Sequence, residues 1–296
     1  MGTVTAVRGR LRQQAWQGAV VLARTTGRLS ANRRLTPDFL VVGAQRAGTT
    51  SLYQALRQHP SFLPARLRKG VHYFDMAYHR PMSWYRAHFP TRRRAAAVAA
   101  TLGAPVVTGE FSPYYMWHPL APARIAADLP GVKVVAMLRD PVERAYSAHA
   151  HELARGFETE PFERAVELEP ARLAGEVAKM TDDPGYASHA VQHQAYLARG
   201  RYHEQLTRLS DLVGRERLHV IDSEEFFTAP EQVFSQLCEF LEIPPRTTGV
   251  RFARHNARPR SDLPAGLRRR LEDSFATADE ELARWWGRTP SWRAYG

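Results

Sequence analysis

The sequence VVGAQRAGTTSL, residues 41–52, contains the features from which the fold of this 296-residue chain can be predicted. It begins within the apolar run 39–42, which is short and rich in β-branched residues, as is typical of a strand buried in a parallel sheet. Gly43 and Gly48 allow a tight turn, and a helical pattern follows over about residues 50–58. This order predicts an anion site, because loop N–H groups and the positive end of the helix dipole face the same point.

The spacing of this loop is close to that of the nucleoside triphosphate loop GxxxxGK[ST], with one difference in charge. Thr50 stands at the hydroxyl position, but Thr49 replaces the lysine, and the cation of the loop is Arg46. A nucleoside triphosphatase needs that lysine and a metal ion to neutralise the β- and γ-phosphates. The loop therefore favours a ligand with a single phosphate-linked leaving bond, although a simple glycine turn between strand and helix would have the same spacing.

The remainder of the chain alternates between expected strands and expected helices. Strands are expected at residues 105–108, 132–138 and 218–221, and helices after Pro141 and over about residues 230–241. This alternation predicts a P-loop-like α/β fold with three layers, in which helices flank a central, mostly parallel sheet. Ligands are expected at the carboxyl ends of its strands. The acidic stretch 157–187 lacks a strand pattern, and we expect a helical insertion or lid there.

The composition excludes several classes of protein. Hydrophobic residues make up 44% of the chain, enough for a large core, which excludes a disordered protein. Cys238 is the only cysteine, so a disulfide within the chain and a multi-cysteine metal site are excluded. His189 and His193 have no further ligands at motif spacing, and we expect no metal. The apolar run near the start is far shorter than the roughly 20 residues of a membrane-spanning helix, and we expect a cytoplasmic protein.

The positive charge is concentrated at the start of the chain. The formal net charge is +11, and residues 1–37 carry seven arginines and no acid. This segment is either a basic amphipathic helix that contacts an anionic membrane or another domain, or a solvated arm. We therefore divide the chain into a basic N-terminal arm, residues 1–37, and a single domain, residues 38–296. Coding bias toward arginine would also explain part of the charge.

A second anion-binding motif is VVAMLRDPVERAYS, residues 134–147. Arg139 follows an expected strand, and its guanidinium offers a bidentate fork to a phosphate. Ser147 lies on the helix that follows and offers a hydroxyl to the same group. Two separate anion sites favour a bisphosphorylated nucleotide over a triphosphate, and they make nucleic acid a less favoured partner.

Together these motifs resemble the sulfotransferases that use 3′-phosphoadenosine 5′-phosphosulfate (PAPS). Residues 42–51 resemble the 5′-phosphosulfate loop, and Arg139 with Ser147 resembles the 3′-phosphate element. Residues 68–90, 109–115 and 285–292 are similar to the heparan sulfate branch and its bacterial relatives, so the resemblance extends from about residue 38 to the end. It implies transfer of a sulfuryl group, without metal, to a hydroxyl or less favourably an amine. The acceptor class would be a carbohydrate, a glycolipid or a related small molecule, including a lipid.

The resemblance also implies which residues bind PAPS. The C-terminal part of the set belongs to a segment similar to the family's final nucleotide-covering loop, and Tyr202 is expected either beside the nucleotide or in the core. The expected donor-binding residues are Gln45, Arg46, Ala47, Gly48, Thr49, Thr50, Ser51, Arg139, Ser147, Tyr202, Arg254 and Arg258.

The expected catalytic residues are Arg46, His72, Asp75 and Glu110. Arg46 would stabilise the leaving phosphate, His72 would accept the acceptor's proton, and Asp75 would orient His72. Glu110 is the second candidate for the base. The heparan branch usually carries a glutamate two residues before His72, and this chain has Gly70 there. That difference keeps a catalytically degenerate nucleotide binder open as an alternative, alongside a nucleotide kinase or NTPase.

Overall fold

The computed structural model describes residues 30–66, 68–255 and 262–294, and its centre is a four-stranded parallel sheet. The strand order is β2-β1-β3-β4. The strands are β1 (Phe39–Gly43), β2 (Gly109–Phe111), β3 (Lys133–Leu138) and β4 (Leu218–Asp222). All three pairings are parallel. The expected α/β fold with a parallel sheet is therefore confirmed.

The second strand lies later in the chain than the sequence predicts. We expected it at residues 105–108, but the ladder with β1 begins at Gly109, which pairs with Phe39. Residues 107 and 108 are engaged elsewhere: Val107 forms an isolated bridge with Phe62, and the N–H of Thr108 donates to the Asp38 carboxylate at 2.7 Å. The prediction was wrong because the apolar run pairs outside the sheet.

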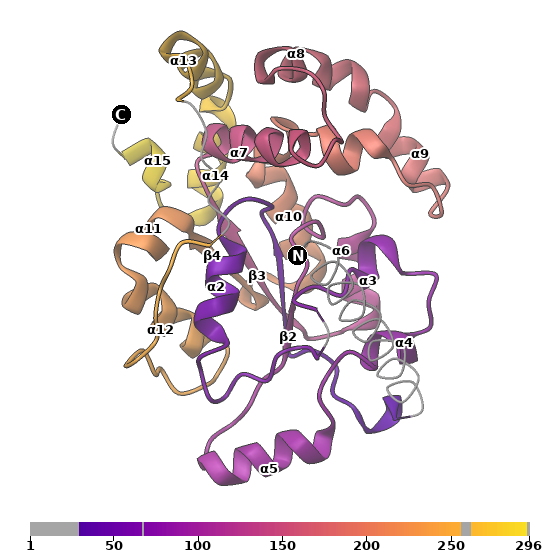
Figure 1. Cartoon of the computed structure of the whole chain (residues 1–296), viewed down its shortest axis with the longest axis vertical. Helices are drawn as coiled ribbons and strands as arrows, with labels where there is room; N and C mark the ends of the chain where they lie inside the picture. Colours follow the sequence, from indigo (N-terminus) through magenta and orange to yellow (C-terminus); the bar gives the residue numbers. More distant parts are fainter. Residues whose placement is uncertain (1–29, 67, 256–261, 295–296) are drawn as a thin grey trace, which may run out of the picture.

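Helices cover both faces of this sheet. On one side in Figure 1 lie α2, α11 and α12, and on the other lie α3, α4 and α6. The helices that follow the strands directly are α2 (Thr49–Leu56), α7 (Pro141–Leu153) and α11 (Ser223–Thr228). The others outside the insertion are α3 (Tyr73–Met76), α4 (Met82–Arg86), α5 (Arg92–Leu102), α6 (Ala121–Asp128), α10 (Tyr202–Val213), α12 (Pro230–Phe240), α13 (Ala265–Ser274), α14 (Ala276–Trp286) and α15 (Ser291–Ala294).

The acidic stretch 157–187 is helical, as expected. It forms α8 (Phe162–Leu173) and α9 (Glu176–Asp182), which lie beyond α7 in Figure 1. Short turns complete the chain: the 3₁₀-helices η1 (Ala31–Arg33), η3 (Ala198–Gly200) and η4 (Arg215–Arg217), and the π-helix η2 (Ala190–Gln194). Helix α9 and η2 are in contact, so the insertion forms one body with the segment that follows it.

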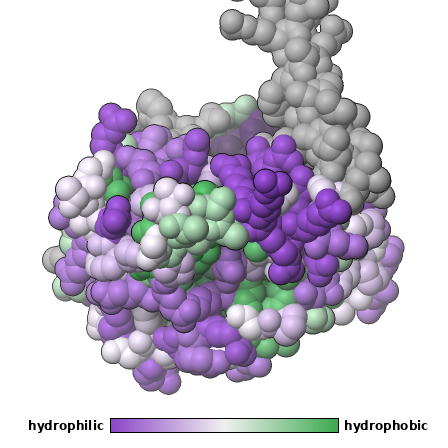
Figure 2. All heavy atoms as spheres, turned by 90° about the horizontal axis from the view of Figure 1, so that it is seen from below, coloured by the Kyte–Doolittle hydropathy of each residue, from purple (hydrophilic) through white to green (hydrophobic). Residues whose placement is uncertain are grey.

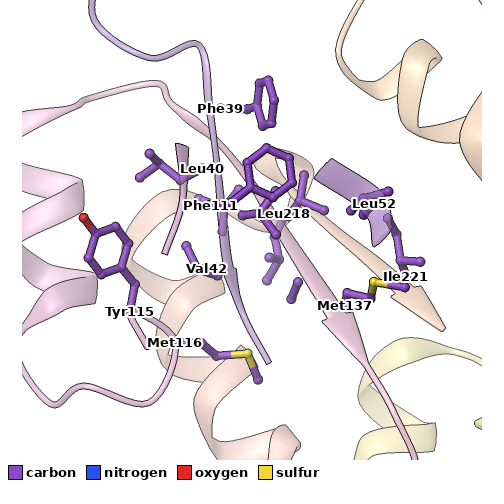
Figure 3. Packing of buried hydrophobic residues seen from close by; sticks show 14 of the residues in the cluster. Phe39, Leu40, Val42, Leu52, Phe111, Tyr115, Met116, Met137, Leu218 and Ile221 are labelled. Carbon is purple, nitrogen blue, oxygen red and sulfur yellow. The ribbon is translucent and has the colours of Figure 1, made fainter. Parts of the chain in front are cut away.

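The core lies on both faces of β1, every residue of which is buried. The rings of Phe39, Phe62 and Phe111 meet in tilted and edge-to-face geometry, with centroids 5.8–6.4 Å apart. Figure 3 shows Phe39 and Phe111 near Leu52 of α2, with Met116 and Met137 further along the sheet. The rings therefore pack at the start of β1, and Met116 lies against Gly43 at its other end, where the glycine loop begins.

The face seen from below in Figure 1 is mainly hydrophilic, with small hydrophobic areas (Figure 2).

Of the basic arm, residues 1–29 lie outside the described part of the chain, whereas Arg34 is buried and donates to the carbonyl of Phe89 at 2.7 Å. The end of the expected arm is thus part of the folded domain. Within the described residues, none of the helices has the length and apolar character to span a membrane.

Candidate active site

The loop between β1 and α2 is shaped by backbone conformations that the sequence signals only in part. Gly48 stands at the N-terminus of α2 with φ +99°, a region that favours glycine. Arg46 also has a positive φ, +73°, although it carries a side chain. Thr49, Thr50 and Ser51 then begin α2, so hydroxyls surround the positive end of its dipole. This arrangement matches the expected anion-binding loop.

The second motif lies directly beside this loop. Pro141 begins α7, and Asp140 caps the helix by accepting hydrogen bonds from the N–H groups of Val142 and Glu143. This cap fixes Arg139 at the end of β3, where its Nη1 lies 3.4 Å from the carbonyl oxygen of Arg46. The side chain of Arg139, between β3 and α7, therefore holds the backbone of the loop between β1 and α2.

A direct side-chain contact also joins the two motifs. The Nε of Arg46 donates to Ser147 Oγ at 3.2 Å, across 101 residues of sequence. Arg139 in turn pairs with Glu143 at 3.2 Å. The two motifs in which we expect anion binding therefore adjoin one another.

A cavity of about 330 Å³ opens between these elements. Its lining contains the cations of Arg46, Lys69, Arg139 and Arg254 and the single carboxylate of Glu224. Of the expected donor-binding residues, the structure brings together Gln45, Arg46, Ala47, Gly48, Thr49, Thr50, Arg139, Ser147 and Arg254. The excess of positive charge makes this cavity suitable for an anion with two separate groups.

Two expected donor-binding residues lie outside the lining of the cavity, and a third lies outside the described residues. Ser51 is 2% exposed and its Oγ accepts from the N–H of His255, so it does not line the cavity. Tyr202 is 1% exposed and donates to the carbonyl of Arg139 at 2.8 Å, behind the cavity wall. Both therefore support residues that face the cavity. Arg258 lies outside the described residues.

Lys69 is a site residue that the sequence reasoning missed. Its Nζ donates to Thr49 Oγ1 at 3.2 Å and to Thr50 Oγ1 at 3.0 Å. The ammonium therefore stands at the start of α2, beside the position at which triphosphate loops carry their own lysine. Burial lowers the pKa of Lys69 to about 7. One signal was present in the sequence, since only three of the 41 basic residues are lysines.

His72 and Asp75 form a pair on the segment that leads into α3. The Nδ1 of His72 lies 2.8 Å from Asp75 Oδ2, and the His72 side chain is 39% exposed whereas that of Asp75 is fully covered. Burial lowers the pKa of His72, but the hydrogen bond and the charge of Asp75, together with the charge of Glu110, outweigh it and raise the pKa above its ordinary value. This geometry suits a histidine base oriented by a carboxylate.

Glu110, at the centre of β2, is fully buried beneath this pair. Its Oε1 accepts hydrogen bonds from the N–H groups of Val71 and His72 at 2.9 and 3.0 Å. The hydroxyls of Ser112 and Tyr115 donate to the same oxygen, and that of Tyr85 donates to Oε2 at 2.6 Å. With five donors, this carboxylate braces the backbone of His72, which has φ +57°.

Gly70 lies where the chain passes closest to β2. A Cβ at this position would stand 2.5 Å from the carbonyl oxygen of Phe111 and 2.8 Å from Ser112 Oγ. Both distances are shorter than real carbon contacts. A glutamate at this position would therefore require a different path of residues 69–72.

We expect Gly70→Ala to lower the free energy of unfolding by about 1–3 kcal/mol, because its Cβ meets backbone that is fixed in the sheet. Thermal unfolding should show a Tm several degrees below that of the wild type. Gly266→Ala is the matched control, since no heavy atom lies within 4 Å of a Cβ there and α13 favours alanine. An unchanged Tm for Gly70→Ala would contradict the close approach.

The two histidines considered as metal ligands lie near one another. His189 and His193 have ring centroids 4.9 Å apart, and His193 Nδ1 lies 2.9 Å from Glu152 Oε2. Across residues 30–66, 68–255 and 262–294, no group of three or more metal-ligating side chains was found.

The family model and the relatives that this chain matches all belong to one family. The chain matches a family model described as a sulfotransferase domain over residues 36–256. It is 25% identical over 279 residues to the bifunctional heparan sulfate N-deacetylase/N-sulfotransferase 1 of Caenorhabditis elegans, which covers 86% of this chain and 30% of that protein. It is 36% identical over 123 residues to human heparan sulfate glucosamine 3-O-sulfotransferase 6, covering 42% of this chain and 32% of that one. The chain thus spans about a third of the length of these relatives.

A solved structure supports the same assignment. A sulfotransferase from Alicyclobacillus acidocaldarius is 27% identical, with a TM-score of 0.61 over 86% of this chain and 97% of that one. The membrane-associated sulfotransferase kil1 of Dictyostelium discoideum is 25% identical over 272 residues, which cover 70% of this chain and 56% of that protein.

Proposed function

The chain is an enzyme of the sulfotransferase family, and from this premise we propose that it transfers a sulfuryl group from PAPS to a hydroxyl group of a carbohydrate or of a related small acceptor. The observation that carries the proposal is the joining of both anion-binding motifs in one cavity, with Arg46 Nε 3.2 Å from Ser147 Oγ. A nucleotide with a phosphate at each end needs two such groups at a fixed separation.

The residues of the cavity fit this donor. The start of α2, Arg46 and Lys69 would hold the 5′-phosphosulfate, since they gather N–H groups, hydroxyls and two cations. Arg139 and Ser147 would hold the 3′-phosphate. Arg254, whose guanidinium lies 4.2 Å from the centroid of the Phe227 ring, would close the remaining side.

The chemistry is an in-line displacement for which the protein supplies charge and position. PAPS contributes the sulfuryl group and the 5′-phosphate that leaves. The acceptor oxygen forms a bond to sulfur, the bond from sulfur to the bridging oxygen breaks, and its electron pair stays on that oxygen. Arg46 and Lys69 stabilise this growing negative charge. His72 takes the proton of the acceptor hydroxyl at its Nε2, and Asp75 holds the ring by Nδ1.

Glu110 has a positioning role in this scheme. Its oxygens already accept five hydrogen bonds within the protein, and its side chain is fully buried. An acceptor hydroxyl cannot approach this carboxylate without opening the core around it, because the side chain has no exposed surface. His72, whose side chain is 39% exposed, is the base that an acceptor can approach.

Thermal unfolding with three ligands tests the proposed donor. Adenosine 3′,5′-bisphosphate without metal should raise the Tm. Adenosine 5′-monophosphate should raise it less, because it has no 3′-phosphate for Arg139 and Ser147 to bind. Stabilisation by ATP with Mg²⁺ alone would favour a nucleotide kinase or NTPase instead. Thr49 at the lysine position argues against that alternative.

Because the pKa of Lys69 is low, we expect binding of the bisphosphate to weaken at alkaline pH. Its pKa is about 7 in the free protein, and a bound phosphate favours the charged form, so the bound pKa is higher. Above pH 7 the phosphates are fully ionised, since their second pKa is about 6. Each pH unit between 7 and the bound pKa should therefore raise the Kd up to about tenfold.

Calorimetric titration of Lys69→Arg checks this dependence, because arginine stays charged throughout the range. The variant should bind with a Kd that changes little between pH 7 and 9. Lys133→Arg is the control, since that lysine pairs with Glu242 at 2.8 Å and does not line the cavity. Equal pH slopes for the wild type and Lys69→Arg would contradict a role for Lys69 in phosphate binding.

A further inference from the structure

A second cavity, of about 360 Å³, lies beside the cationic one. Pro113 lines the cationic cavity and Tyr114, the next residue, lines the second, so this segment forms the wall between them. Asp75, the partner of His72, also lines the second cavity. The cavity therefore borders Asp75, the carboxylate of the acid–base pair.

The walls of this cavity are mainly aromatic and apolar. One wall comes from the end of α3 and the residues after it, with Met76 and Tyr78, and the opposite wall comes from the insertion, with Met180 and Tyr186. In Figure 1 the end of α9 lies on the same side of the sheet as α3 and α6. Tyrosine rings offer a flat apolar face with a hydroxyl at the rim, which suits a ring-shaped ligand that carries hydroxyls.

The ionisable groups of the cavity leave little charge for a ligand. Asp75 is fully covered and paired with His72. Arg124 donates to the carbonyl of Phe74 at 2.9 Å, and its guanidinium lies 4.4 Å from the centroid of the Tyr78 ring. Burial lowers the pKa of His118 to about 4, so its imidazole is neutral at pH 7. A chain of sulfates or carboxylates finds no row of cations here.

A basic groove on another side of the site makes the contrast clear. It is lined by Arg57, Arg66, Arg68, Arg94 and Lys69, and no acidic residue lines it among those described. A polyanion would be attracted to this groove. However, Asp75 lines the aromatic cavity and not the groove, whereas the groove reaches the acid–base pair only through the charge of Arg68, which lowers the pKa of His72.

The aromatic cavity is also connected to the phosphate loop. The guanidinium of Arg199 is buried, donates to Gln45 in the loop, and donates to the carbonyl of Gln192 at 2.7 Å. Gln192 lines the aromatic cavity, and the Arg199 guanidinium lies 5.1 Å from the centroid of the Tyr114 ring. One arginine thus fixes the loop and two elements of the neighbouring wall relative to each other.

On the basis of the proposed sulfuryl transfer, we propose that this aromatic cavity is the acceptor site and that it binds a compact, uncharged, ring-bearing alcohol, such as a neutral glycoside. A volume of about 360 Å³ accommodates a ligand of one or two rings, near the lower end for small-molecule sites. The acceptor hydroxyl would enter past Tyr114 toward His72. Polyanionic glycan chains are excluded as the preferred acceptors, because the cavity has no row of cations to pair with their sulfates or carboxylates.

The test compares two acceptors of opposite charge. Transfer from labelled PAPS is measured with 4-nitrophenyl β-D-glucopyranoside and with a uronate-containing hexasaccharide. The neutral glucoside should be sulfated with saturable kinetics, and Tyr186→Ala should raise its KM at least tenfold. Met76→Ala, at a 56% exposed position, should raise it about threefold without affecting folding. Arg94→Gln, in the basic groove, is the control and should leave this KM unchanged.

Two further results would overturn the acceptor assignment. One is sulfation of the hexasaccharide with a KM that responds to Arg94→Gln and not to Met76→Ala, which would place the acceptor in the basic groove. The other is the absence of saturable glucoside binding, by calorimetry, to the complex with adenosine 3′,5′-bisphosphate. In both cases stabilisation by the bisphosphate would leave the proposed function intact, whereas loss of that stabilisation would refute the function itself.

Discussion

Arg46→Ala is expected to lower kcat/KM for sulfuryl transfer by about a thousandfold. The guanidinium belongs to the loop that holds the leaving phosphate, and a cation that stabilises transition-state charge in phosphoryl transfer contributes 10³–10⁵ to the rate. Arg46 also joins the two halves of the site through its 3.2 Å hydrogen bond to Ser147. Its removal therefore weakens both charge stabilisation and the position of the loop. Initial rates with labelled PAPS at saturating acceptor measure the effect.

Arg46→Lys is the matched variant for this prediction. It keeps the positive charge at this position, but it loses the hydrogen-bonding fork of the guanidinium. We expect activity within about tenfold of the wild type if charge is the main contribution. If Arg46→Ala keeps more than a tenth of the wild-type rate, Arg46 does not stabilise the leaving phosphate, and Lys69 supplies the positive charge at the start of α2.

The sequence predicted those parts of the fold that depend on local order along the chain. An apolar run, a glycine loop and three hydroxyl residues are contiguous, so β1, the loop and α2 were all expected within two residues of their observed bounds. The same holds for β3 and Arg139. The second strand was misplaced because its pairing depends on Phe62 and Asp38, which are distant in sequence.

The contacts that complete the site could not be predicted, because they join segments that are far apart in sequence. Lys69 reaches Thr49 and Thr50 because its own carbonyl accepts a hydrogen bond from the N–H of Phe111 in β2, which holds this segment beside the start of α2. The absence of a glutamate at Gly70 seemed to remove a base. The structure shows instead that a side chain at this position would collide with Phe111, so the difference is one of packing as well as chemistry.

His72→Ala is expected to lower kcat at least a hundredfold while binding of adenosine 3′,5′-bisphosphate stays within about threefold. The imidazole takes the acceptor's proton, and general-base catalysis contributes about 10²–10⁴ to the rate. Because His72 does not line the cationic cavity, its loss leaves the nucleotide contacts in place. His203→Ala is the control, since that histidine of α10 pairs with Glu281 of α14 and lines neither cavity. Near-normal turnover of His72→Ala would exclude this base.

The pH profile separates a base from a residue that merely packs. The wild-type kcat should rise with pH through a midpoint higher than about 6.5, because Asp75 and Glu110 raise the pKa of His72 and only the neutral ring accepts a proton. It should fall again only at the higher pH at which Lys69 loses its charge in the bound state. Asp75→Asn removes the main opposing charge, and burial, which lowers the pKa, then dominates. Its midpoint should therefore fall below that of the wild type although its kcat also falls. A midpoint that does not move in Asp75→Asn would contradict the assignment of the titrating group to His72, since Asp75 supplies the largest contributions that raise its pKa.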